Sequence, residues 1–141
     1  MRNLFIDTNV VIDFLANRKP FSTSALKLFG LSYNNKIKLY ISAVSYNNIY
    51  YILKQSNSHK DAINLLNELM GMTEVLDVSK AVIENALKSD FKDFEDAIQY
   101  YCAKSLDKID LIITRDTKDF KKSDLPVLTS DEVISLLANE N

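Results

Sequence analysis

Three acidic residues stand at positions of the chain where parallel strands and helices would bring them together. Asp7 directly follows the apolar segment 4–6, and Asp116 follows a second apolar segment, 111–115. Asp96 lies near the start of a predicted helix that immediately precedes the second segment. The carboxyl ends of parallel strands meet at one edge of a sheet, and a helix running antiparallel to them begins at that edge. We therefore expect these three acids to converge.

Clustered carboxylates impose a particular chemistry on a site. Two unit charges about 4 Å apart repel by about 4 kcal/mol at an effective dielectric constant near 20, so such acids must take up protons or bind a cation. Ligands that are all oxygen suit Mg²⁺ or Mn²⁺, whereas zinc prefers His and Cys, of which the chain has one each. Carboxylate-held Mg²⁺ or Mn²⁺ activates water for phosphodiester hydrolysis. The residues thus predict metal-dependent phosphoryl chemistry without identifying the substrate.

The segments that must position these acids alternate between predicted strands and helices. Strands are predicted at residues 4–6, 38–42, 74–78, 111–114 and 127–129. Between and after them, helices are predicted at 10–15, 22–34, 45–55, 58–70, 79–87, 93–106 and from about 131 onward, with Ser45 as an N-cap and Gly71 as a C-terminal stop. This alternation predicts an α/β fold with a mainly parallel sheet and helices on both of its faces, in a single domain spanning residues 1–141.

Composition excludes several classes of protein. The 141 residues carry 17 Lys and Arg against 19 Asp and Glu, a net charge of −2, which is poor support for a protein that coats nucleic acid. Only 2 Gly and 2 Pro argue against glycine-rich phosphate loops and turn-dense β folds. Cys102 is the lone cysteine, no apolar run reaches the ~18 residues of a membrane span, and Asp7 comes too early for a signal peptide. We expect a cytoplasmic protein without a membrane partner.

Four blocks of the sequence, in this order and spacing, resemble the PIN-domain family: FIDTNVVIDFL, YISAVSYNNIYYIL, KDFEDAIQYYCA and LIITRDTKDF. The family includes the VapC-like toxin nucleases of bacterial toxin–antitoxin pairs, and the resemblance covers nearly the whole chain. It implies a three-layer α/β/α sandwich and an endoribonuclease that uses Mg²⁺ or Mn²⁺ to cleave single-stranded RNA. If the protein is a toxin, the resemblance further implies a homodimer and a small antitoxin protein that covers the site.

The resemblance also assigns roles to individual residues. Asp7, Asp96 and Asp116 would hold the metal, with hydrogen-bonding support from Thr8, Asn9 and Thr114. PIN nucleases generally carry a Glu on the helix after the second strand, and here that position is Asn48, or alternatively Asn47. The segment resembles a PIN subgroup with Asn at this place. Asn can offer a carbonyl oxygen but adds no negative charge and cannot act as a base. Glu95 would restore the missing carboxylate if its side chain turns inward.

Several of these residues have simpler structural interpretations. Asp7 can cap a helix, Asp96 can form part of a capping arrangement with Asp93, and Asp116 can open a turn. Asp13 is expected on a solvated helix face or as a partner of Arg18. Among the basic residues, those near the carboxyl edge of the sheet are expected to hold RNA phosphates, with Arg115 the first candidate and Lys118 the second.

Two other functions compete with a nuclease. The first is a catalytically weak PIN-like module that binds RNA or assembles with partners, because Asn48 replaces an acid. The second is a small-molecule phosphohydrolase on a Rossmann-like sheet. Such an enzyme needs a second Asp two residues after its nucleophilic Asp, and Asn9 occupies that position here, which counts against it.

Overall fold

A five-stranded parallel sheet forms the centre of the protein in the computed structural model, which describes residues 2–140. The strand order is β3-β2-β1-β4-β5, and every neighbouring pair is parallel. The strands are β1 (Arg2–Ile6), β2 (Ile37–Ser42), β3 (Glu74–Leu76), β4 (Leu111–Ile113) and β5 (Val127–Leu128). The predicted parallel sheet is therefore confirmed, although β3 ends two residues earlier than expected.

Helices occupy the connections between the strands. Along the chain they are α1 (Thr8–Leu15), α2 (Ser22–Tyr33), α3 (Ala43–Leu53), α4 (His59–Met72), α5 (Lys80–Lys88), α6 (Phe94–Lys104), the 3₁₀ helix η1 (Thr117–Phe120) and α7 (Ser130–Ala138). Within the described part of the chain, none of them has the length and apolar character to cross a membrane.

Two residues predicted to mark helix ends do not do so in the structure. Ser45 was expected to cap the third helix, but Ser42 does so by accepting a hydrogen bond from the Val44 amide, and α3 follows β2 without a loop. Ser45 lies instead inside α3 and is buried. Gly71 was expected to end α4, yet the helix continues to Met72, and Thr73 caps it in an extended conformation.

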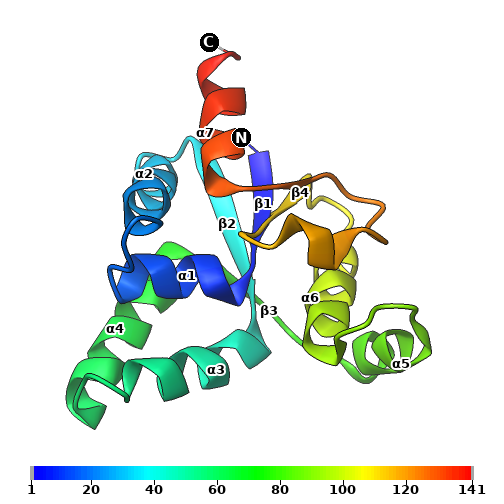
Figure 1. The fold of residues 1–141 in the computed structure, drawn as a ribbon, viewed down its shortest axis with the longest axis horizontal. Coiled ribbons are helices and arrows are strands. Elements are labelled where there is room, and N and C mark those ends of the chain that lie inside the picture. Colours follow the sequence, from blue (N-terminus) through cyan, green and yellow to red (C-terminus); the bar gives the residue numbers. More distant parts are fainter. Residues whose placement is uncertain (1, 141) are drawn as a thin grey trace.

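Alternating side chains of the strands pack into two separate hydrophobic cores, one on each face of the sheet. Leu4 and Ile6 of β1 point into the core beneath α1, α2, α3, α4 and α7, whereas Phe5 points to the opposite face, beneath α5, α6 and η1. Figure 1 shows the two groups of helices on either side of the strands. This period of two is what a strand buried on both faces requires, and it confirms the predicted helix–sheet–helix layering.

The register between β1 and β4 determines which residues lie next to each other where the two strands end. Ile6 of β1 is paired with Ile113 of β4, and the Asp7 amide donates to the Ile113 carbonyl at 2.9 Å. The next residues, Asp7 and Thr114, therefore emerge side by side at the carboxyl edge of the sheet.

Candidate active site at the carboxyl edge of the sheet

Asp7 is the most buried acid of this edge, with 6% of its surface exposed. Its Oδ1 accepts a hydrogen bond from the Thr8 amide at 2.8 Å, so it caps α1, and its Oδ2 accepts one from the Thr114 hydroxyl at 2.8 Å. Burial raises the pKa of Asp7 to about 6 against the opposing effect of these two hydrogen bonds, and the charges of Glu95 and Asp116 raise it further. The cap and the candidate ligand are thus the same residue, held in one orientation.

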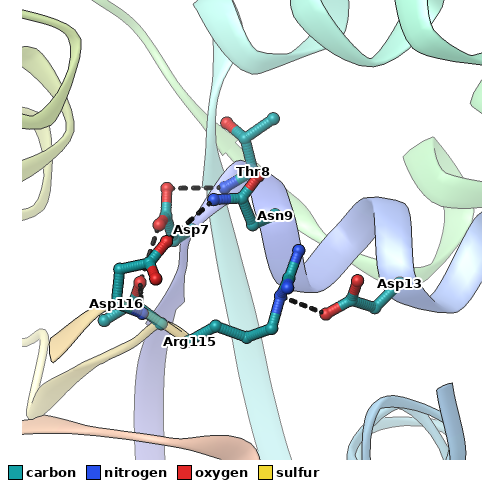
Figure 2. A network of polar contacts seen from close by, with 7 residues as sticks. Asp7, Thr8, Asn9, Asp13, Arg115 and Asp116 are labelled. Carbon is teal, nitrogen blue, oxygen red and sulfur yellow. Dashed lines mark hydrogen bonds and ion pairs between the residues drawn. The ribbon is translucent and has the colours of Figure 1, made fainter. Parts of the chain in front are cut away.

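Asp116 lies next to Asp7 at the end of the neighbouring strand. Asn9 reaches from the first turn of α1 and its amide donates to Asp116 Oδ2 at 3.4 Å, while Thr114 accepts a hydrogen bond from the Asp116 amide at 3.1 Å. Figure 2 shows Asp7 and Asp116 close together, with Asn9 directed at Asp116. The three residues expected to give hydrogen-bonding support, Thr8, Asn9 and Thr114, all contact one of these two acids.

Asp96 approaches from the start of α6. Asp93 is the N-cap of this helix and accepts a hydrogen bond from the Asp96 amide at 3.0 Å, but no donor among residues 2–140 bonds to the Asp96 carboxylate itself. Burial raises the pKa of Asp96 to about 7, and the charges of Asp93, Asp7 and Asp119 add to the effect. Asp119 was not predicted as a site residue, because in the sequence it resembles an ordinary turn residue.

Glu95 and Asn48 are joined across the site. The Asn48 amide donates to Glu95 Oε1 at 2.9 Å, which brings α3 and the start of α6 together. Glu95 also acts on Asp7 and Asp96 by charge, since it contributes to raising both pKa values. Of the two Asn residues named for the position of the expected acid, Asn48 is the one that bonds to a carboxylate from α6.

The donor set fits a hard divalent cation in its chemistry. The acids at this edge offer oxygen ligands, and burial, together with the charges of neighbouring acids, raises the pKa of Asp7 and Asp96. Among residues 2–140, however, no three acid, His or Cys side chains come close enough to form a preorganised cage. Mg²⁺ commonly keeps several of its waters and takes only one or two protein carboxylates, so pairs of these acids suffice in principle.

A buried polar network underlies the acids. The Thr8 and Ser45 hydroxyls lie 2.7 Å apart, and the Gln99 amide donates to Ser45 at 3.0 Å and to Thr8 at 3.4 Å. All three side chains are buried, and they tie together α1, α3 and α6. This role of Ser45 and Gln99 was not predicted from the sequence. Their spacing could have indicated that they lie on the same helix faces as the site residues, because Ser45 precedes Asn48 by one helical turn and Gln99 follows Asp96 by one turn.

Arg115 and Asp13 form an ion pair beside the acids. Arg115 Nε lies 2.9 Å from Asp13 Oδ2, and the side chain of Asp13 is only 2% exposed. Burial raises the pKa of Asp13, and Arg115 opposes this shift. The expectation of a solvated Asp13 was therefore wrong. Its ion pair is with Arg115, which the loop after β4 lays across this face of α1 (Figure 2), while Arg18 acts on Asp13 by charge.

Lys118 lines a cleft that opens beside Asp96. The cleft has a volume of about 550 Å³, and most of the residues around it are charged: Asp90, Lys92, Asp93, Asp96, Lys118, Asp119, Lys121 and Lys122. Lys118 thus lies near one of the candidate metal ligands, as its position after Asp116 suggested.

Comparison with known proteins agrees with this arrangement. Residues 3–118 match the family model described as PIN domain. Ribonuclease VapC1 from Aquifex aeolicus (strain VF5) is 30% identical over 134 residues, which cover 92% of this chain and 91% of that protein.

Solved structures share the fold at lower identity. The DNA-bound VapBC structure from Salmonella typhimurium superimposes with a TM-score of 0.70 at 16% identity, covering 92% of this chain and 99% of that one. VapC20 from Mycobacterium tuberculosis, described as a sarcin-ricin loop cleaving toxin, gives a TM-score of 0.61 at 16% identity over 77% of this chain and 86% of that one. The chain belongs to the PIN-domain family and is VapC-like.

Proposed function

We propose that this protein is an endoribonuclease that uses Mg²⁺ or Mn²⁺ to cleave single-stranded RNA. The observation that carries the proposal is the set of acids at the carboxyl edge of the sheet: burial raises the pKa of Asp7 and Asp96, and the charge of Glu95 adds to both shifts. Such a group is stable in its ionised form only with a cation, and its oxygen donors suit these two ions. The relative from Aquifex aeolicus is named a ribonuclease, which supports RNA as the substrate.

Each acid of the site would have a distinct task. Asp7, fixed through both oxygens, and Asp116, held by Asn9, would hold the ion from the ends of their strands. Asp96 would contribute carboxylate oxygens that accept no hydrogen bond from any described residue, and Asn48 would keep Glu95 turned toward the site. When bound, Mg²⁺ or Mn²⁺ would lower the pKa of the attacking water and stabilise charge on the phosphate.

The charged cleft beside Asp96 suggests where RNA phosphates lie. Lys118, Lys121, Lys122 and Lys92 line it, and none of the four forms an ion pair within residues 2–140. We assign Lys118, the first of them after Asp116, to a backbone phosphate. Lysine acts in such a place as a point charge that positions the strand without reading its sequence.

The test is a cleavage assay on a mixed-sequence single-stranded RNA with Mn²⁺, Mg²⁺ or EDTA. Wild type should cut only with metal, and Asp7→Asn and Asp96→Asn should abolish cutting while the far-ultraviolet circular dichroism spectrum stays unchanged. Asp61→Asn is a matched control, because this acid also lies in the first turn of a helix but is exposed and on α4. Activity retained in Asp7→Asn, or cutting in EDTA, would contradict the proposal.

We also propose that the protein is the toxin of a toxin–antitoxin pair, works as a homodimer and is inhibited by a small antitoxin. The support is the likeness of the fold to the DNA-bound VapBC structure from Salmonella typhimurium and to a toxin–antitoxin complex from Klebsiella pneumoniae. Expression of the chain alone should arrest growth, and coexpression of a neighbouring small reading frame should relieve the arrest. Growth unaffected by the active protein would count against this role while leaving the nuclease chemistry untouched.

A catalytically weak RNA-binding module remains the second candidate because of one observation. Asn48 stands where an acid is usual and is engaged with Glu95, so the site has one negative charge fewer at this position. Binding of the same RNA without cutting, at every Mn²⁺ and Mg²⁺ concentration, would favour this module over the nuclease.

A further inference from the structure

A second, smaller cleft adjoins the candidate active site on the side of Arg115. Its volume is about 290 Å³, and its walls include Pro20, Phe21, Ser24, Arg115, Thr129 and Asp131. Arg115 directly precedes Asp116, and Asp13 lies one helical turn after Asn9 on α1. Two of its lining residues, Asp13 and Arg115, therefore lie beside the candidate active site. Figure 2 shows the pair Asp13–Arg115 next to the pair Asn9–Asp116, and the charge of Asp116 acts on Asp13.

An arginine and an aromatic ring lie against each other in the wall of this cleft. The guanidinium carbon of Arg115 lies 4.2 Å from the centre of the Phe21 ring, and the ring is 44% exposed although it is large and apolar. The buried carboxylate of Asp13 holds Nε of Arg115, while 29% of the arginine side chain stays accessible. The Arg115 side chain is thus already restrained by Asp13 and by the Phe21 ring. It therefore loses little further conformational entropy when a planar group stacks on its guanidinium.

Charge in this cleft argues against a phosphate as its occupant. Asp13 already compensates Arg115, and Asp131, which bonds to the Ser24 hydroxyl, adds a negative charge to the wall. A neutral planar ligand with polar edges suits such surroundings better. The volume lies just below the usual range for small-molecule sites, so the cleft fits one ring system rather than a length of chain.

We propose that this cleft binds one unpaired nucleobase of the RNA substrate, stacked on Arg115 and Phe21 next to the cleaved phosphate. The inference rests on the proposed ribonuclease function and extends it with a base-binding subsite. Unpaired bases stack on aromatic side chains and on arginine planes, and their edges then meet hydrogen-bonding groups. Ser24, Thr129 and Asp131 supply such groups at the wall.

Binding measured without cleavage tests the subsite. All variants are made in the Asp7→Asn background, and the affinity for a short fluorescein-labelled single-stranded RNA is followed by anisotropy at several salt concentrations. Phe21→Leu should weaken binding about five-fold or more, the size expected for the loss of one base–aromatic stack. Arg115→Lys, which keeps the charge and loses the plane, should weaken it in the same direction.

Two controls separate stacking from other causes. Tyr33→Leu removes an aromatic ring that is 81% exposed at the end of α2, away from the carboxyl edge of the sheet, and should leave the affinity unchanged. Lys118→Ala should reduce the dependence of affinity on salt, whereas Phe21→Leu should leave that dependence as it is, because stacking releases no counterions. A series of RNAs, each with an abasic residue at a different position, locates the stacked base. Phe21→Leu should weaken binding of every RNA in the series except the one that lacks this base.

The outcomes distinguish this inference from the proposed function. Affinity that is unchanged in Phe21→Leu overturns the subsite, and a loss of self-association in that variant instead identifies the cleft as a protein contact. Failure of the Asp7→Asn protein to bind single-stranded RNA at all also overturns it. If wild type binds RNA through Phe21 but never cuts it, the base-binding subsite is supported and the proposed nuclease function is contradicted.

Discussion

Asn48 donates a hydrogen bond to Glu95 at 2.9 Å, across the gap between α3 and α6. The amide of Asn48, at a position where the resemblance to PIN nucleases predicts an acid, thus bonds to an acid from another helix. Because Glu95 acts by charge on both Asp7 and Asp96, it can compensate for the negative charge that Asn48 lacks. We expect Glu95 to supply the carboxylate that Asn48 lacks.

Glu95→Gln tests this compensation. The substitution keeps an oxygen that can accept from Asn48 and removes one negative charge, so affinity for Mn²⁺ should fall about ten-fold, as is usual when a group that supports metal ligands is lost. Isothermal titration calorimetry with Mn²⁺ measures it. Glu68→Gln, an exposed site on α4, should change nothing. Equal affinities of wild type and Glu95→Gln would mean that Glu95 has no part in holding the ion.

Thr114→Val tests the orientation of Asp7. Valine has nearly the shape of threonine but cannot donate to Asp7 Oδ2, so the buried carboxylate loses the hydrogen bond that lowers its pKa. We expect cleavage to fall about ten-fold or more at neutral pH and its pH profile to move upward, at a cost in stability of about 1 kcal/mol. The measurement is kcat against pH.

The matching control for that substitution is Thr23→Val on the exposed side of α2, which should leave the profile in place. A pH profile identical to that of wild type in Thr114→Val would show that this hydroxyl does not act on the reaction.

The sequence predicted the sheet and its acids because both depend on local pattern. Strand β1 is a short apolar run that ends in Asp7, and the parallel topology then places Asp7 beside the end of β4. Asp93 as the cap of α6 was likewise predictable from its type and position. These features depend on the order of polar and apolar residues along the chain, so they can be predicted from the sequence.

Contacts between distant elements were beyond such reasoning. Asp13 has the spacing of an exposed helical acid, and only the loop after β4 makes it buried by laying Arg115 over it. Ser42 and Ser45 are equally good caps in sequence, and the choice depends on whether β2 passes directly into α3. In each case tertiary packing overrides a local preference.

Ser45→Ala tests the network beneath the acids. It removes the hydroxyl that accepts from Gln99 and bonds to Thr8, leaving buried polar groups with fewer partners, so the free energy of unfolding should fall by about 1–2 kcal/mol. Because the network joins α1, α3 and α6, the affinity for Mn²⁺ should fall as well. Urea unfolding and calorimetry on one preparation measure both.

Ser45→Thr, which restores a hydroxyl, should recover part of the Mn²⁺ affinity. Loss of stability with unchanged Mn²⁺ affinity would make the network a feature of the core alone.

Asp96→Asn should stabilise the metal-free protein in alkaline solution and not in acid. The pKa of Asp96 is about 7 in the folded chain against 3.8 as a model value, so between these pH values the folded carboxyl keeps a proton that the unfolded one has released. Stability therefore falls as the pH rises from about 4 to 7 and then levels off. Asn carries no charge and avoids this loss, which amounts to about 1–2 kcal/mol once the partial exposure of Asp96 is allowed for.

Urea unfolding in EDTA at pH 4 and pH 8 measures the effect of Asp96→Asn, with Asp61→Asn as the exposed control that should gain nothing at either pH. Added Mn²⁺ should then reverse the order at pH 8, since wild type binds the ion in its folded state and the variant has lost a ligand. A variant no more stable than wild type at pH 8 in EDTA would mean that neither burial nor the neighbouring charges destabilise the carboxylate of Asp96. In that case repulsion among these acids would no longer be a reason to expect a cation between them.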